Sequence, residues 1–267
     1  MENITSILPA INSEKICKNI EKRIQNFVEK TKTDGIIVGI SGGIDSAVTT
    51  ALAVRAIGKT KVLGLIMPAA HQDPSFENDA QQLANQLGIK TEKIPLEMIM
   101  TAIKKQIKQD IVENRVAKGN IFARLRMLLL YAYANHLHYL VVGTSNKSEI
   151  KVGYFTKYGD GGADFEPIGD IYKTHLKKIA EYLEIPSQII QKPPSAGFWK
   201  NQTDEKEMGI TYEKLDNILY GFEKDFSDKE LVKKLGIKLK TVKKVKNMIE
   251  KSEHKRKMPP IFKIKIS

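Results

Sequence analysis

One short glycine-rich segment constrains the fold of this chain more than any other feature of its sequence. Residues 36–40 (IIVGI) form a continuous apolar run that is typical of a buried strand, and residues 47–58 (AVTTALAVRAIG) have the composition of a helix. The turn between them includes Ser41-Gly42-Gly43-Ile44-Asp45-Ser46. Adjacent glycines let backbone N–H groups approach an anion closely, and the helix that follows adds its positive N-terminal end. The segment therefore predicts a strand–turn–helix unit with an anion-binding turn.

The rest of the chain repeats this alternation of strands and helices. Such a pattern predicts an α/β fold, a Rossmann-like parallel sheet with helices on both faces, here followed by short C-terminal helices. Residues 145–170 are rich in Gly, Asp and Lys without periodicity, which predicts a long loop of the functional kind. The expected strands are 36–40, 62–67, 89–94 and 139–144, and the expected helices are 13–32, 47–58, 76–88, 97–110, 121–137, 172–184, 211–223, 228–235 and 240–255.

Charge is distributed unevenly along the 267 residues. The chain has 43 Lys and Arg against 31 Asp and Glu, a formal net charge of +12. Residues 229–267 hold 14 of the basic and 3 of the acidic residues, whereas residues 1–228 are nearly neutral with 29 and 28. A basic charge of this size indicates an anionic partner. We expect a single domain over residues 1–267, with a basic helical tail from about residue 225 as part of it.

Composition excludes several classes of protein. A single cysteine, Cys17, leaves no internal disulfide, no cysteine-rich metal site and no redox pair. No apolar run approaches the roughly 20 residues that a bilayer-spanning helix needs. Residues 1–15 lack the basic start and the apolar core of a signal peptide. We therefore expect a soluble cytoplasmic protein with no membrane partner.

The side chains of the glycine-rich turn indicate which anion it binds. Ser41 and Ser46 can donate hydroxyl groups to phosphate oxygens, whereas the carboxylate of Asp45 would be repelled by a bare phosphate. Asp45 fits a phosphate site only with a cation between them, for which Mg²⁺ is the usual choice. Gly58-Lys59-Thr60 resembles the end of a Walker A loop, but Ala53 stands where that motif needs its earlier glycine, so a Walker A loop is excluded. No GxGxxG dinucleotide motif is present either.

The segment SGGIDS resembles the pyrophosphate-binding loop of the ATP pyrophosphatases, which split ATP between its α- and β-phosphates and use AMP to activate a carbonyl or carboxylate oxygen. Four further segments resemble, in the same order, segments of the ammonia-dependent NAD synthetases, so that the resemblance covers about residues 14–260. It implies the adenine nucleotide alpha-hydrolase-like version of the fold. The four segments are 119–131 (GNIFARLRMLLLY), 141–173 (VVGTSNKSEIKVGYFTKYGDGGADFEPIGDIYK), 192–216 (KPPSAGFWKNQTDEKEMGITYEKLD) and 253–260 (EHKRKMPP).

This resemblance assigns roles to individual residues. Glu149 follows the strand 139–144 at the edge where parallel sheets bind ligands, and it is implied as a second Mg²⁺ carboxylate beside Asp45. Asp45, Lys173 and Asp164 are the implied catalytic residues. Arg126, which points away from Arg124 on the same helix, is left open between a binding and a structural role. The implied ATP-binding residues are Gly39, Ile40, Ser41, Gly42, Gly43, Ile44, Asp45, Ser46, Thr144, Lys173 and Ser195, and those for deamido-NAD⁺ are Arg124, Lys157, Asp164, His254 and Lys255.

The resemblance also implies a reaction and its partners. ATP, the co-substrate, would adenylate the carboxylate of deamido-NAD⁺, and ammonia would then displace AMP to give NAD⁺, with Mg²⁺ as the metal cofactor. Glutamine-dependent relatives carry a separate amidase domain, for which 267 residues leave no room, so we expect ammonia as the nitrogen donor, either free or supplied by a separate glutaminase. The family is homodimeric, and the apolar helix 121–137 is the expected interface.

Two other functions compete with this one. Residues 228–246 have the pattern of a helix–turn–helix with Gly236 at the turn and a lysine-rich second helix, which would suit nucleic-acid binding. The chain lacks the cysteines of zinc-binding or sulfur-carrying tRNA-modifying enzymes, and its tail matches the synthetase family's own, so no nucleic-acid partner is expected. A nucleotide-binding scaffold without activity would leave both Mg²⁺ carboxylates idle.

Overall fold

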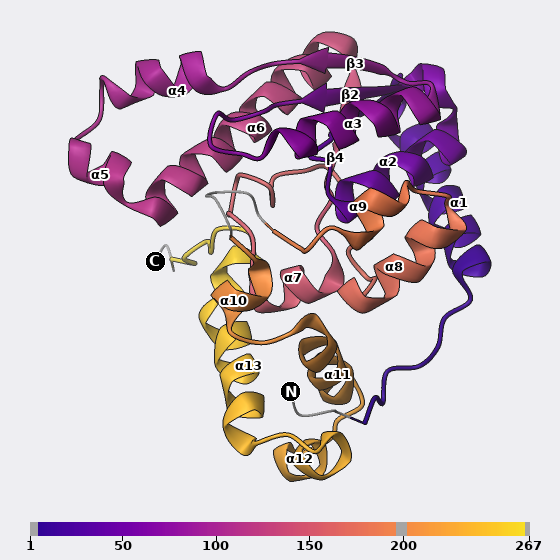
Figure 1. Ribbon diagram of the computed structural model, residues 1–267, viewed down its shortest axis with the longest axis vertical. Helices are drawn as coiled ribbons and strands as arrows, with labels where there is room; N and C mark the ends of the chain where they lie inside the picture. The colour runs from indigo at the N-terminus through magenta and orange to yellow at the C-terminus, as the bar shows by residue number, and fades with distance from the viewer. Residues whose placement is uncertain (1–4, 196–201, 265–267) are drawn as a thin grey trace.

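A four-stranded parallel sheet forms the centre of the molecule, with the strand order β3-β2-β1-β4. The computed structural model describes residues 5–195 and 202–264, and Figure 1 shows the helices arranged around the sheet. The predicted parallel sheet with helices on both faces is confirmed. The strands are β1 (Gly35–Gly39), β2 (Val62–Ile66), β3 (Lys90–Lys93) and β4 (Tyr139–Val142), and the helices around them are α1 (Ser13–Thr31), α2 (Ile44–Ile57), α3 (Pro74–Leu87), α4 (Glu97–Lys104), α5 (Gln109–Glu113), α6 (Arg115–Leu137), α7 (Lys147–Val152), α8 (Lys173–Tyr182) and α9 (Ser187–Gln191).

Side-chain alternation in the central strand β1 separates two hydrophobic layers. Ile36 and Val38 point to the face covered by α1, α2, α3 and α8, whereas Ile37 points to the face covered by α4 and α6. Helices cover both layers, and all three side chains are fully buried. A strand buried on both faces has to be apolar at every position, which explains the continuous run IIV.

The C-terminal helices pack around a third hydrophobic cluster below the sheet (Figure 1). We call them, with the segment between them, the C-terminal module. Its α12 and α13 are joined at Gly236, where the sequence predicts a turn, and the φ of 63° at this residue is the left-handed conformation that favours glycine. The module consists of α10 (Asp204–Met208), α11 (Tyr212–Glu223), α12 (Asp228–Leu235) and α13 (Leu239–Lys251), followed by one 3₁₀ turn (Glu253–Lys255).

The structure differs from the predicted elements at a few points. The predicted helix 97–110 is two helices, because the chain is extended at Lys108, and α6 begins at Arg115 rather than at residue 121 because Asn114 caps it. The expected loop 145–170 contains α7, which was not predicted. In the described part of the chain, no helix combines the length and the apolar character required to cross a membrane.

Candidate active site

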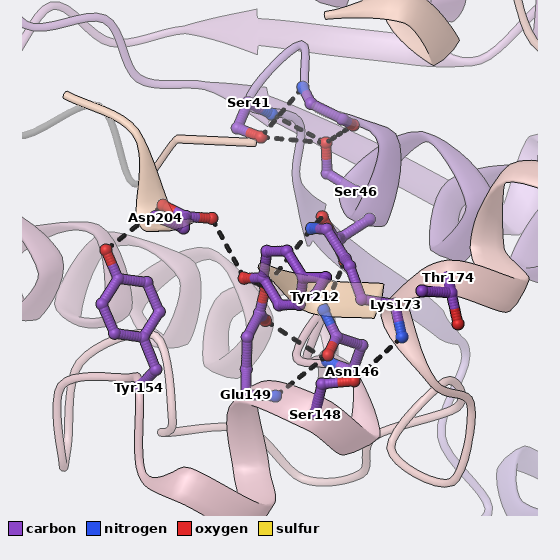
Figure 2. A network of polar contacts seen from close by, with 12 residues as sticks. Ser41, Ser46, Asn146, Ser148, Glu149, Tyr154, Lys173, Thr174, Asp204 and Tyr212 are labelled. Atoms are coloured by element: carbon purple, nitrogen blue, oxygen red, sulfur yellow. Dashed lines mark hydrogen bonds and ion pairs between the residues drawn. The ribbon is translucent and has the colours of Figure 1, made fainter. Parts of the chain in front are cut away.

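The glycine-rich turn leads from the C-terminal end of β1 into α2, as predicted. Ser46, in the first turn of α2, donates its hydroxyl to the carbonyl of Gly43 at 3.0 Å and accepts the backbone N–H of Ser41 at 3.2 Å. The two serine hydroxyls lie 3.0 Å apart (Figure 2). These bonds fix the turn around the N-terminus of a 14-residue helix, where unpaired N–H groups and the helix dipole favour an anion.

Gly42 shapes this turn. Its φ of 76° is the left-handed conformation that side chains disfavour, and a Cβ atom there would lie 2.1 Å from the carbonyl oxygen of Phe76. Gly42 was predicted to bind ATP with its neighbours, but it is not among the residues that line the cavity described below. The position requires glycine for conformation and for space.

Asp45 and Glu149 converge on the side chain of Lys173. The Lys173 ammonium is in contact with Oδ2 of Asp45 and lies 3.3 Å from Oε1 of Glu149, and Asn146 donates its side-chain amide to Oδ1 of Asp45 at 2.8 Å. We call Asp45, Glu149 and Lys173 the carboxylate–lysine centre. The three residues come from α2, α7 and α8, so the sheet edge brings together positions 128 residues apart.

Local structure explains why these three side chains meet. Asn146 and Glu149 form a capping box that starts α7 shortly after β4 ends at Val142, and this places the Glu149 carboxylate at the edge of the sheet. Ser148 donates its hydroxyl to buried Asp216 at 2.5 Å and accepts the backbone N–H of Lys173 at 2.9 Å. Asp216 therefore links α7 and α8 from the side of the C-terminal module.

Burial and charge act against each other at the centre. Burial raises the pKa of Glu149 above its ordinary value, and the attraction of Lys173 opposes this shift. Burial acts to lower the pKa of Lys173, but the charges of Asp45 and Glu149 outweigh it and raise the pKa above its ordinary value. Lys173 is therefore a permanent cation beside two carboxylates, with 7% of its side chain exposed.

The turn and the centre open into one cavity of about 550 Å³. Its wall includes two further cations, Lys192 and Arg126. Arg126 donates to the carbonyl of Met67 at 3.2 Å, and burial lowers its pKa to about 10, so it serves the structure as well as lining the cavity. Of the residues predicted to bind ATP or Mg²⁺, the cavity is lined by Gly39, Ile40, Ser41, Gly43, Ile44, Asp45, Ser46, Thr144, Glu149, Lys173 and Ser195.

The residues predicted to bind deamido-NAD⁺ lie outside the lining of this cavity. Exposed Arg124 donates to the carbonyl of Lys157 at 3.3 Å, and the Lys157 ammonium lies 2.5 Å from the carbonyl oxygen of His254. Lys255 donates to the carbonyls of Gly153 and Phe155, both at 2.8 Å. The structure thus brings Arg124, Lys157 and the C-terminal turn together at the surface.

Asp164 is held at the end of β4 rather than in the cavity. Its carboxylate accepts the hydroxyl of Tyr131 at 3.1 Å and the backbone N–H of Val141 at 2.7 Å. Asp160, four residues earlier in the same segment, does line the cavity and accepts the backbone N–H of Thr156 at 2.9 Å.

Some site residues could not be found from the sequence. Asn146, Asp204 and Tyr212 contact the carboxylate–lysine centre or its partners, and only Asn146 carried a signal, the Asn-x-x-Glu spacing of a capping box. Gly197, Phe198 and Trp199, which fall within one of the family-like segments, lie outside the described residues.

The fold and the site define a nucleotide-binding α/β protein of the PP-loop class. The NAD synthase family model matches residues 16–259, and the chain belongs to this family. An NH₃-dependent NAD⁺ synthetase from Methanosarcina acetivorans is 47% identical over 249 residues, which are 93% of this chain and 97% of that protein.

Solved structures agree with this assignment. An NH₃-dependent NAD synthetase from Campylobacter jejuni, in complex with a nitrate ion, superimposes with a TM-score of 0.81 at 33% identity, over 95% of this chain and all of the other. An NMN synthetase from Francisella tularensis superimposes with a TM-score of 0.83 at 32% identity, over 96% of this chain and all of the other.

Proposed function

We propose that this chain uses ATP to join ammonia to the nicotinate carboxylate of deamido-NAD⁺, giving NAD⁺, AMP and pyrophosphate. It is an NAD⁺ synthase of the ammonia-dependent kind, a carbon–nitrogen ligase, and residues 1–267 act as one catalytic unit. The observation that carries the proposal is the meeting of the SGGIDS turn with Asp45, Glu149 and Lys173 in one cavity.

The reaction has two displacements. A carboxylate oxygen of deamido-NAD⁺ attacks the α-phosphorus of ATP, and pyrophosphate leaves with the electron pair of the broken P–O bond. Ammonia then attacks the carboxyl carbon, AMP leaves with the electron pair of the C–O bond, and the nitrogen loses a proton. A carboxylate is a poor acyl donor because oxide would have to leave, and adenylation replaces that leaving group with AMP.

The chain contributes position and charge. The N–H groups and hydroxyls of the turn, with the N-terminus of α2, hold the departing pyrophosphate, and the Lys173 ammonium faces the same phosphates. Holding both reactants on one protein turns a reaction between separate molecules into one within a complex. Neither displacement requires a covalent intermediate on a side chain.

The residues present suit Mg²⁺. Asp45 and Glu149 offer oxygen ligands that already converge on one cation, the Lys173 ammonium. Mg²⁺ is commonly held by one or two carboxylates together with substrate phosphates. Asp45 and Glu149 would hold the ion, and phosphate oxygens of ATP would supply further ligands. When bound, the ion neutralises phosphate charge during the displacement.

The dinucleotide end consists of Arg124, Lys157, Asp164, His254 and Lys255. In this proposal the basic side chains exchange their carbonyl partners for the phosphate oxygens of deamido-NAD⁺. Asp164 orders the segment beside them.

We also propose a homodimer that buries the outer face of α6. Leu128 on this helix is 58% exposed, although large apolar side chains favour burial. A dimer by light scattering that becomes a monomer in Leu128→Glu supports this interface, and a wild-type monomer contradicts it.

One incubation tests the proposed function. Purified protein with MgATP, deamido-NAD⁺ and ammonium should yield NAD⁺, AMP and pyrophosphate in equal amounts. The solved structure from Francisella tularensis is named an NMN synthetase. A parallel reaction with nicotinate mononucleotide therefore tests whether this chain makes nicotinamide mononucleotide instead. Faster turnover of the mononucleotide, or unequal products, would contradict the proposal.

A further inference from the structure

A tyrosine hydroxyl from the C-terminal module reaches the carboxylate–lysine centre. Tyr212, the first residue of α11, is 4% exposed, and its hydroxyl lies 3.2 Å from Oε1 of Glu149 and 3.1 Å from Oδ2 of Asp204 (Figure 2). The Lys173 ammonium lies 5.3 Å from the centre of its ring. We propose that Tyr212 is a positioning residue that orients Glu149 for the cation of the ATP site.

The hydroxyl group of Tyr212 is held in place by the module. The backbone N–H of Tyr212 donates to Oε1 of Glu205 at 2.8 Å, and Thr211 caps the helix immediately before it. The ring belongs to the hydrophobic cluster of the module, together with fully buried Leu215 and Ile218. A phenol in such surroundings has little freedom, so the position of its oxygen is set by packing.

The contacts of Glu149 show what the hydroxyl does. Tyr212 and Lys173 both approach Oε1, at 3.2 and 3.3 Å. Within the described residues, Oε2 accepts only a long bond of 3.4 Å from the backbone N–H of Asn146. Two donors on one oxygen fix the rotation of the carboxylate and leave the other oxygen available to a cation.

Loss of the hydroxyl should therefore loosen Glu149 specifically. A phenol keeps its proton at neutral pH and has one hydrogen to donate, which it can give to Glu149 or to Asp204. Tyr212→Phe keeps the ring beside Lys173 and removes only the hydroxyl, with its contacts to Glu149 and Asp204. Lys173 alone would then hold Oε1, while its ammonium is also engaged by Asp45.

The test measures metal binding apart from turnover. Mn²⁺, a paramagnetic substitute for Mg²⁺, is titrated by electron paramagnetic resonance into full-length protein with α,β-methylene-ATP, which cannot be split at the reacting bond. Tyr212→Phe should weaken Mn²⁺ binding about tenfold, equivalent to about 1.4 kcal/mol. Tyr220→Phe, on the same helix two turns further along, is the matched control and should bind Mn²⁺ like wild type.

A double-mutant cycle separates positioning from general stability. In a Glu149→Gln background, adding Tyr212→Phe should weaken Mn²⁺ binding no further, because the carboxylate on which Tyr212 acts is gone. Additive losses, or unchanged Mn²⁺ affinity in Tyr212→Phe, would overturn the inference. The inference relies on the proposed function for the identity of the nucleotide site, but wild-type protein that binds Mn²⁺–nucleotide and does not amidate deamido-NAD⁺ would refute the proposed function alone.

Discussion

The two ends of the candidate site are built in different ways. At the ATP end, Asp45, Glu149 and Lys173 are enclosed and bonded to one another through side chains fixed by α2, α7 and α8. At the dinucleotide end, Arg124 and Lys157 lie at the surface and donate to backbone carbonyls. The interior therefore preorganises charge for the phosphates and the metal, whereas the dinucleotide end has to exchange its contacts when substrate binds.

The largest effect is expected from the enclosed end. Asp45→Asn should lower kcat by about 10²–10³-fold, because it removes a preorganised charge at the reacting phosphates. Cys17→Ser is the control and should keep wild-type kcat, because Cys17 lies on the buried face of α1 and burial raises the pKa of its thiol to about 11. Full activity in Asp45→Asn would show that the reaction does not take place at the carboxylate–lysine centre.

Asp216, which links α7 and α8 next to the carboxylate–lysine centre, should make the stability of the protein depend on pH. Burial raises the pKa of Asp216 to about 6, from an ordinary value of 3.8, so the folded state binds a proton more tightly than the unfolded state. The contribution of this group to stability is therefore full below about pH 4 and is lost as pH rises through about 6, by up to about 3 kcal/mol. Urea unfolding at several pH values should show this loss in wild type and not in Asp216→Asn. Parallel pH profiles for the two proteins would disprove it.

A smaller and more selective effect is expected at the dinucleotide end. Lys157→Met should raise the KM for deamido-NAD⁺ about tenfold, the size of one hydrogen bond between charged groups, with the KM for ATP unchanged. Lys151→Met on α7, where Lys151 pairs with Glu223 at 3.3 Å, is the matched surface control and should leave both constants unchanged. Equal rises for both substrates would mean that the two ends are not separate.

The smallest of these effects is expected from salt, which should change the KM values of the two substrates to different extents. Exposed charges are screened over about 8 Å at physiological ionic strength, and buried pairs are screened much less. Raising potassium chloride from about 0.05 to about 0.3 M should increase the KM for deamido-NAD⁺ about threefold and the KM for ATP less. The opposite order in steady-state kinetics would reverse the comparison.

The same contrast explains which parts could be predicted from sequence. The strands, the helices around them and the phosphate turn follow from local patterns, since an apolar run, two glycines and a helix are neighbours in the chain. Glu149 could be placed because the C-terminal ends of parallel strands meet at one edge. The sequence predicts a loop over 145–170 because the six residues of α7 are too few to show a helical period.

Contacts between distant segments could not be predicted. Tyr212 meets Glu149 across 63 residues, and an isolated tyrosine at the start of a short helix gives no signal for that. Asp160 and Asp164 belong to one segment, and only the folded chain shows that Asp160 lines the cavity while Asp164 binds the backbone of β4. Which of two nearby carboxylates faces a site depends on the turn between them.

The fate of the carboxylate oxygen tests the proposed chemistry most directly. Deamido-NAD⁺ labelled with ¹⁸O in its nicotinate carboxylate is converted with MgATP and ammonium, and the ¹⁸O content of AMP and pyrophosphate is measured by mass spectrometry. Adenylation in the enclosed cavity predicts one ¹⁸O atom in AMP and none in pyrophosphate, because the attacking carboxylate oxygen stays with the α-phosphorus. Unlabelled AMP, or label in pyrophosphate, would contradict the account.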